Sequence, residues 1–160
     1  MAVAAGAALI AAAAVVAILL AARGGAAQTA PREDDLRGFM AGVVSEVVHN
    51  DYARAWLSLN PEHQRVAPQP EYVACERLNP IKLALNKVEV VSIANRWFAM
   101  PGHDEPVRGK EIKVQITLAN PATEERARST HVFHAVAVGS RWTWVLPATA
   151  YELYRTDSCS

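Results

Sequence analysis

Apolar and polar residues alternate along two short segments near the C-terminal end of the chain, from residue 128 to residue 146. Gly139-Ser140 separates the segments, and a glycine-containing dipeptide at such a place is typical of a two-residue β-hairpin turn. A turn there pairs Val138 with Arg141, Ala137 with Trp142 and Ala135 with Trp144. Each tryptophan ring then lies opposite a small alanine, which leaves room for the ring on one face of the sheet.

The two faces of this predicted hairpin differ in composition. One face carries both tryptophans and consists of Phe133, Ala135, Ala137, Trp142, Trp144 and Leu146. The other is rich in valine and consists of Val132, His134, Val136, Val138, Thr143 and Val145. Because a layer of helices covers only one side of a sheet, we expect it on the tryptophan face. The valine face is then free to associate, and its interface candidates are Val132, His134, Val136, Val138 and Val145.

The part of the chain before residue 80 has helical periodicity. From Leu36 to Val48 the apolar residues recur three and four positions apart, and the acidic residues 33–35 precede them, where a helix favours negative charge. A second helix over residues 52–59 follows Asp51, which is expected to cap it. Pro61 suits the first turn of a brief helix through Arg65, and a third main helix is predicted over residues 71–78.

Strand-type composition follows. Residues 87–100 are rich in β-branched and aromatic side chains, and residues 107–118 alternate, with Ile112, Val114, Ile116 and Leu118 on one face. Helices followed by antiparallel strands predict an α+β domain, with three short helices packed on a curved, cone-like antiparallel sheet of about four strands. The residues after Pro147 are expected to lie back on this body.

Residues 2–22 carry no charged side chain, and as a helix they span about 30 Å, the thickness of the hydrocarbon core of a bilayer. We expect residues 1–23 to form a transmembrane anchor or a cleaved signal segment, residues 24–32 a linker, and residues 33–160 one domain. We favour a single-pass anchor in the cell membrane with an extracytoplasmic C-terminal domain, and secretion is the alternative. No Lys or Arg precedes the apolar segment, so charge does not set its orientation.

The chain has two cysteines, Cys75 and Cys159, and their spacing is not that of a metal site. In an exported domain, a disulfide between them pins the C-terminal tail and contributes about 4–5 kcal/mol in the chain-entropy model. Two unpaired buried thiols are the alternative interpretation.

Sixteen basic and sixteen acidic residues cancel, and no basic stripe is present. This balance argues against nucleic acid as a partner. The expected partners are the membrane, through residues 2–22, and either a second copy of the chain or another protein of the cell envelope.

Four short stretches carry a family resemblance: residues 49–56 (HNDYARAW), 60–63 (NPEH), 71–75 (EYVAC) and 139–146 (GSRWTWVL). Their order resembles the nuclear transport factor 2-like superfamily, in particular its small exported actinobacterial members of unknown function. The resemblance covers about residues 33–155. It implies a cone of helices over a curved sheet, but this fold hosts enzymes, binding modules and assembly domains, so it implies no single function.

Catalytic members of that superfamily, such as ketosteroid isomerase and polyketide cyclases, use a carboxylate base in a buried pocket. Here the strands offer only Glu89 and Glu111, and Glu111 falls on the polar face. His131 and His134 are three apart on a strand, so they point to opposite faces and cannot share a metal. His63 and His103 are interpreted as loop residues. We expect no catalytic residue, metal or cofactor.

Two functions remain as hypotheses. The first is a membrane-tethered, non-catalytic domain for protein interaction or assembly of an envelope complex. The second is a carrier of a small apolar ligand, or an isomerase- or cyclase-like enzyme, that uses the interior of the cone. The pocket candidates for this second function are the four tryptophans, Trp56, Trp97, Trp142 and Trp144, although such rings are more often core residues.

Overall fold

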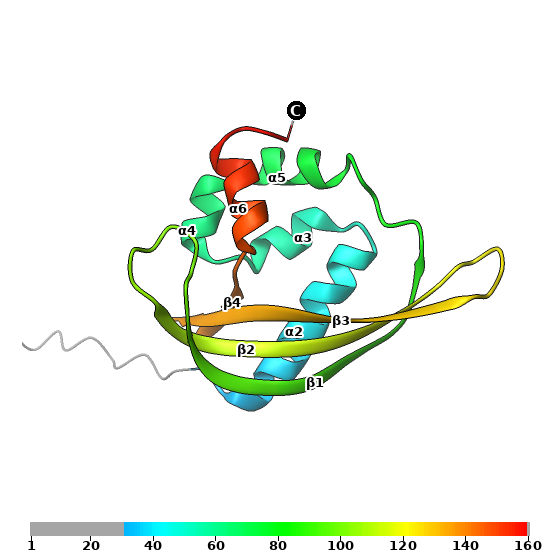
Figure 1. Cartoon of the computed structure of the whole chain (residues 1–160), viewed down its shortest axis with the longest axis horizontal. Helices are drawn as coiled ribbons and strands as arrows, with labels where there is room; N and C mark the ends of the chain where they lie inside the picture. Colours follow the sequence, from blue (N-terminus) through cyan, green and yellow to red (C-terminus); the bar gives the residue numbers. More distant parts are fainter. Residues whose placement is uncertain (1–30, 160) are drawn as a thin grey trace, which may run out of the picture.

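The computed structural model describes residues 31–159 and shows an α+β architecture, in which helices lie over one side of an antiparallel sheet (Figure 1). The described helices are α2 (Glu33–Val48), α3 (Tyr52–Leu57), α4 (Pro61–Val66), α5 (Gln69–Glu76) and α6 (Ala148–Arg155). The strands are β1 (Ala84–Phe98), β2 (Val107–Ala119), β3 (Arg126–Val138) and β4 (Arg141–Trp144). The predicted α+β class and four-stranded antiparallel sheet are therefore confirmed.

The number of helices was underestimated. Three short helices were expected, and the structure describes five. The brief helix predicted from Pro61 is α4, and the side chain of Asn60 accepts a hydrogen bond from the Glu62 N–H, which caps its first turn. The tail after Pro147 forms α6, which packs Tyr151 onto the body as the sequence suggested. The expected membrane segment lies outside the described residues. Within residues 31–159, no helix has the length and apolar character needed to cross a bilayer.

The sheet has the strand order β1-β2-β3-β4, and the hairpin register is the one predicted: Ala135 pairs with Trp144, Ala137 with Trp142 and Val138 with Arg141. Strand β4 is only four residues long. It pairs with β3 from residue 135 onward, so the first half of β3 has β2 on one side and no other described strand on the other. Register shifts in β1 near residues 86 and 91 accompany its bend around the helices (Figure 1).

Helix α2 lies across the inner face of the sheet and contributes five buried residues to the main apolar core. Leu36, Met40, Val43 and Val44 on α2 are buried, and they belong to the same apolar cluster as Ile112 of β2. Polar contacts fix the N-terminal part of the helix on the sheet. Lys110 of β2, itself almost buried, pairs with Glu33, and Arg37 Nη1 donates a hydrogen bond of 2.7 Å to the Val90 carbonyl oxygen.

Asn50 ends α2 and holds the approach to β1. Its backbone adopts a left-handed conformation (φ 59°), which asparagine tolerates better than most residues. Its side chain accepts hydrogen bonds from the Ile81 N–H (2.8 Å) and the Tyr52 hydroxyl (2.6 Å). Asp51 occupies the position before α3 but makes no side-chain capping bond; its carboxylate faces Arg54 instead. The predicted capping role of Asp51 is therefore wrong.

Two tryptophans of β4 join the helical layer to the sheet through their indole N–H groups, and a third, Trp56, joins α3 to the end of α4. Trp144 Nε1 donates to the Ala55 carbonyl oxygen (3.0 Å) and Trp142 Nε1 to that of Arg32 (2.9 Å). Trp56 Nε1 donates to the Ala67 carbonyl oxygen (2.7 Å). The backbone of Trp144 also bridges to the chain after α3, where its N–H donates to Ser58 O and its carbonyl accepts from Asn60 N–H. The expectation that helices cover Trp142 and Trp144 is confirmed.

The valine face of the hairpin is covered in part by its own chain. Val136 and Val145 are buried in a second small apolar cluster with Met100, against which Phe98 and Val107 pack. The end of the β1–β2 hairpin folds back over this face. Gly109 permits the close approach, because a Cβ there would lie 2.6 Å from the Ala135 carbonyl oxygen.

The outcome for the interface candidates is therefore mixed. Val136 and Val145 are not accessible, and His134 is half-buried with its ring stacked on Phe98 at a centroid distance of 4.2 Å. Val132 and Val138 are exposed. A continuous uncovered valine surface is absent from the described part of the hairpin.

His63 was interpreted as a loop residue, which is wrong: it lies on α4 and is completely buried. Its Nδ1 accepts a hydrogen bond from the Leu146 N–H (2.9 Å), so the proton resides on Nε2, which donates to the Pro101 carbonyl oxygen (3.1 Å). Burial lowers the pKa of His63, although the bond to Pro101 and nearby Glu62 oppose this shift. The neutral ring thus joins α4, the β1–β2 loop and the chain after β4.

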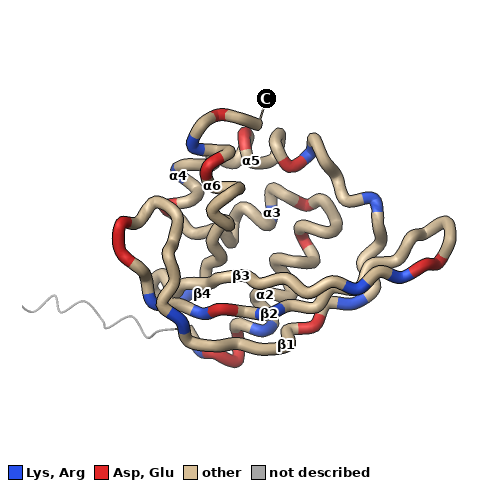
Figure 2. Tube along the Cα trace, in the orientation of Figure 1, with Lys and Arg blue, Asp and Glu red and all other residues tan. Residues whose placement is uncertain are grey.

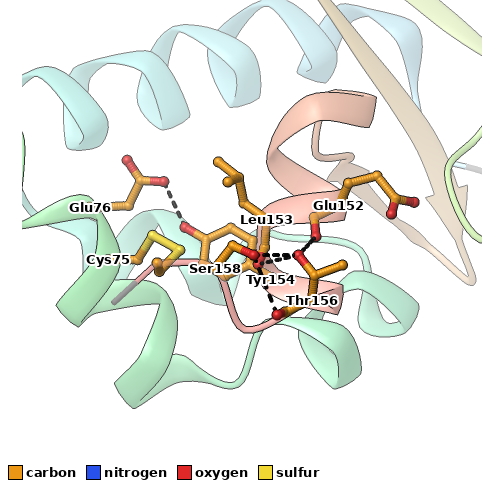
Figure 3. Close-up of a disulfide and its surroundings, with 8 residues drawn as sticks. Cys75, Glu76, Glu152, Leu153, Tyr154, Thr156 and Ser158 are labelled. Carbon is orange, nitrogen blue, oxygen red and sulfur yellow. Dashed lines mark hydrogen bonds between the residues drawn. A yellow bond between two sulfur atoms is a disulfide. The ribbon is translucent and has the colours of Figure 1, made fainter.

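The sulfur atoms of Cys75 and Cys159 are bonded, and this disulfide attaches the end of the chain to α5 (Figure 3). Beside it, the Tyr154 hydroxyl on α6 donates a hydrogen bond of 2.8 Å to Glu76 on α5. Burial, and after it this hydrogen bond, raise the pKa of Tyr154. The covalent ring runs from residue 75 to residue 159 and contains the whole sheet.

We expect Cys159→Ser to lower the free energy of unfolding by about 2–4 kcal/mol, because the unfolded chain loses its cross-link. Urea denaturation followed by circular dichroism measures this change. Dithiothreitol should destabilise the wild-type domain by a similar amount and leave the variant unaffected. Equal sensitivity of both proteins to the reductant would contradict the role of the disulfide.

The stability of the domain should fall as the pH drops below about 6.5, the usual pKa of histidine. The folded-state pKa values of His63 and His134 are both lowered by burial, so the unfolded chain takes up these protons first. The contribution of the neutral His63 and His134 rings to the free energy of unfolding is fully present above pH 6.5 and is lost as the pH falls below it.

His63→Leu should cost about 2–4 kcal/mol at pH 7.5, because it leaves the Leu146 N–H and the Pro101 carbonyl unpaired. It should also flatten the loss of stability between pH 6.5 and pH 5. The control is His131→Gln, at an exposed histidine. Urea denaturation across this pH range tests both statements, and an unchanged pH profile for His63→Leu would contradict them.

Candidate functional site

An apolar cavity of about 310 Å³ lies between the C-terminal half of α2 and the inner face of the sheet. Its walls come from α2, from the chain that enters β1, and from β2, β3 and β4. The lining residues are Val43, Val44, Val47, Val48, Ile81, Ile116, Leu118, Ser129, His131, Phe133 and Trp144. Its volume is at the small end of the range for ligand pockets, which is about 300–1,000 Å³.

The sequence pattern explains why a space remains there. Four valines occupy positions 43, 44, 47 and 48 of α2, so two successive turns present short side chains toward the sheet. Leucine or phenylalanine at these places would reach further into the space. Across from them, strand β2 contributes Ile116 and Leu118, while β4 contributes the ring of Trp144.

Two polar residues of β3 interrupt the apolar lining. Ser129 and His131 pair across the sheet with Ile116 and Val114, so they share the inner face with these apolar residues. The Ser129 Oγ and His131 Nε2 atoms are 2.8 Å apart, which is a hydrogen bond. Both residues are exposed, so the pair forms a polar rim at the open side of the cavity.

The tryptophans predicted as pocket residues do not gather in one place. Only Trp144 lines this cavity, while Trp142 lines a separate shallow depression beside Phe39 and Leu57. Trp56 is half-buried, and its indole is bound to the Ala67 carbonyl. Trp97 is 71% exposed near the end of β1, beyond the region that the helices cover. Of the four candidate tryptophans, the structure therefore places only Trp144 in the lining of this cavity.

No carboxylate lines the cavity among the described residues. Glu111 faces Arg96 (3.9 Å) and Glu89 faces Lys87 (2.7 Å), so both strand carboxylates have cationic neighbours elsewhere. On α2, burial raises the pKa of Glu46, but this side chain is not part of the lining. Within residues 31–159, no group of three or more potential metal ligands comes together.

Charges of both signs alternate around the molecule and do not collect on one surface (Figure 2). Among the described residues, the lining of the cavity contains no Lys, Arg, Asp or Glu. The cavity therefore selects a ligand mainly by apolar contact, and by the hydrogen-bonding capacity of its rim.

The Ser129–His131 pair was not recognised from the sequence. The available signal was their spacing of two on a strand, which places both on the face that also carries Phe133. That face was expected to be apolar, so a serine and a histidine on it mark a place where water or a ligand reaches the sheet. Comparison with known proteins adds no further constraint: no protein-family model and no curated protein sequence matches the chain.

Proposed function

We propose that the domain is a non-catalytic binding module that holds a small apolar molecule between α2 and the sheet. The observation that carries this proposal is the cavity of about 310 Å³, whose walls are valine, isoleucine, leucine, phenylalanine and tryptophan apart from one polar pair. Filling such a space with an apolar ligand removes the ligand from water together with the half-buried side chains of the lining, such as Val47 and Phe133, and this burial is the main driving force for binding.

We place the domain on the outer side of a membrane, tethered by residues 2–22. The disulfide supports this location, because such bonds persist mainly in oxidising compartments. The arrangement of helices over one side of a bent sheet agrees with a nuclear transport factor 2-like fold, whose interior is the usual place for a ligand. Membership of that superfamily is part of the proposal.

A carrier role suits the cavity better than an isomerase or cyclase role. Enzymes of the latter kind need a carboxylate base directed at the substrate. The lining provides none among the described residues, and its only titratable side chain is His131 at the rim. Binding without reaction is thus the function that the side chains support.

Val47→Phe is expected to abolish ligand binding, because the larger ring occupies the cavity from a half-buried position on α2. N-phenyl-1-naphthylamine, an uncharged fluorescent probe, should bind to purified residues 31–160 and lose at least tenfold in affinity in the variant. The matched control is Val132→Phe, on the opposite face of β3. Equal probe fluorescence in both variants would reject the cavity as the binding site.

Association through the outer face of the sheet is a second candidate, favoured by the exposure of Val132 (52%). This face also carries Lys113, directly opposite Val132, and the Arg96–Glu111 pair, so an apolar contact there is small. The surface fits a weak homodimer or a partner protein of the envelope.

If the sheets pair, Val132→Arg should convert a dimer of residues 31–160 to a monomer, because it places like charges at the centre of the contact. Light scattering after size-exclusion chromatography measures the mass. Leu78→Arg, at an exposed leucine after α5, is the control. A wild-type protein that is monomeric at high micromolar concentration would exclude this candidate.

A further inference from the structure

The rim of the cavity is polar, whereas its walls are apolar. Ser129 and His131 are the polar side chains of a lining that is otherwise apolar, and both come from the half of β3 that β4 does not cover. Their side chains bond to each other at 2.8 Å, which fixes both at the opening. Alanine and valine would close this part of the wall equally well, so the pair points to a polar group on the ligand.

The position of the protons on Ser129 and His131 shows which kind of polar group on a ligand this pair can bind. If the proton of the neutral imidazole is on Nδ1, the serine hydroxyl donates to Nε2 and the Nδ1–H is free for another bond. If the proton is on Nε2, the ring donates to Ser129 Oγ and the serine O–H is free. In either arrangement the pair keeps one donor at the rim, and it also keeps an acceptor, which is Ser129 Oγ in the first case and His131 Nδ1 in the second. A ligand that uses this donor must offer a hydrogen-bond acceptor.

The size of the cavity limits the apolar part of the ligand. A water molecule occupies about 30 Å³ in the liquid, so 310 Å³ holds about ten groups of that size. A methylene group is of comparable size, and an unbranched chain of about ten carbons therefore fills the space between the valines of α2 and Trp144.

Resting on the proposed function, the geometry points to a single-chain amphiphile whose head group bears an accepting oxygen, a carboxylate or a hydroxyl. The chain lies among Val43, Val47 and Trp144, and the head group lies at the rim, where it accepts a hydrogen bond from the Ser129–His131 pair. The pair binds the ligand and does not cleave it. Within residues 31–159, the lining holds no carboxylate that could orient the imidazole as the third member of a hydrolytic triad would.

The test uses the full chain reconstituted in phosphatidylcholine vesicles and a photoreactive decanoic acid that carries a diazirine at its far end. After irradiation, peptide mapping should place the label on residues 43–48 or on Trp144. Unlabelled decanoate and decanol should compete with the probe. Decyltrimethylammonium, whose head group accepts no hydrogen bond, should compete about three- to tenfold less well, the worth of one hydrogen bond.

Variants separate the head-group contact from the cavity. The double variant Ser129→Ala/His131→Phe removes both donors and should weaken competition by decanoate and decanol about three- to tenfold, with no effect on decyltrimethylammonium. Each single variant keeps one donor and should bind nearly as the wild type does. Thr130→Ala is the matched control, because this residue lies between the pair on the opposite face of the strand.

The outcomes are distinguishable. Saturable labelling that Val47→Phe abolishes, together with the head-group preference, supports the inference. Labelling that Val47→Phe abolishes but that the double variant and the choice of head group leave unchanged overturns the inference and keeps the apolar cavity. Labelling that Val47→Phe does not affect overturns both.

Discussion

The fold depends on indole N–H groups that bind the backbone of the helical layer. Trp142 and Trp144 are on the shortest strand, yet they donate to the carbonyl oxygens of Arg32 and Ala55, at the start of α2 and within α3. A tryptophan buries a large apolar surface and has one donor, which must find a partner when the ring is buried. Because each partner belongs to a different helix, satisfying both donors fixes where these two helices lie. Ala135 and Ala137 opposite the rings allow them to lie flat enough to do so.

The cavity follows from the same arrangement. The rings of β4 and the Glu33–Lys110 pair hold the N-terminal part of α2 against the sheet, where Leu36 and Met40 fill the interface completely. Beyond residue 43 the helix changes to valines, and the spacing set by the first half leaves the second half without large side chains to fill the gap. The well-packed half of the interface thus determines the shape of the loosely packed half.

Local rules were sufficient for some parts of the fold and not for others. The hairpin register was predictable because a two-residue turn sets it within a few residues. The cover over Val136 and Val145 was not predictable, because it comes from Met100 and its neighbours at the end of the β1–β2 hairpin, which are distant from β3 in the sequence. The role of His63 was missed although the residue lies within the brief helix predicted from Pro61, because its two hydrogen-bond partners lie 38 and 83 residues away in the sequence. At the cavity, Trp144 was named as a candidate from the sequence because tryptophan is a large aromatic residue. The valines of α2 were not named, because they contribute the space that their short side chains leave empty.

The disulfide ring encloses all four strands and α6, but α2 lies outside it, between the ring and the N-terminal residues. A pulling force applied through residues 1–30 therefore meets α2 first and is resisted there by non-covalent contacts alone. The strands, in contrast, are held in a closed covalent loop that such a force cannot straighten. One wall of the cavity is α2, which only non-covalent contacts hold, and the opposite wall is the sheet, which lies within the covalent ring. Tension on the N-terminus would therefore open the cavity before it disturbed the sheet.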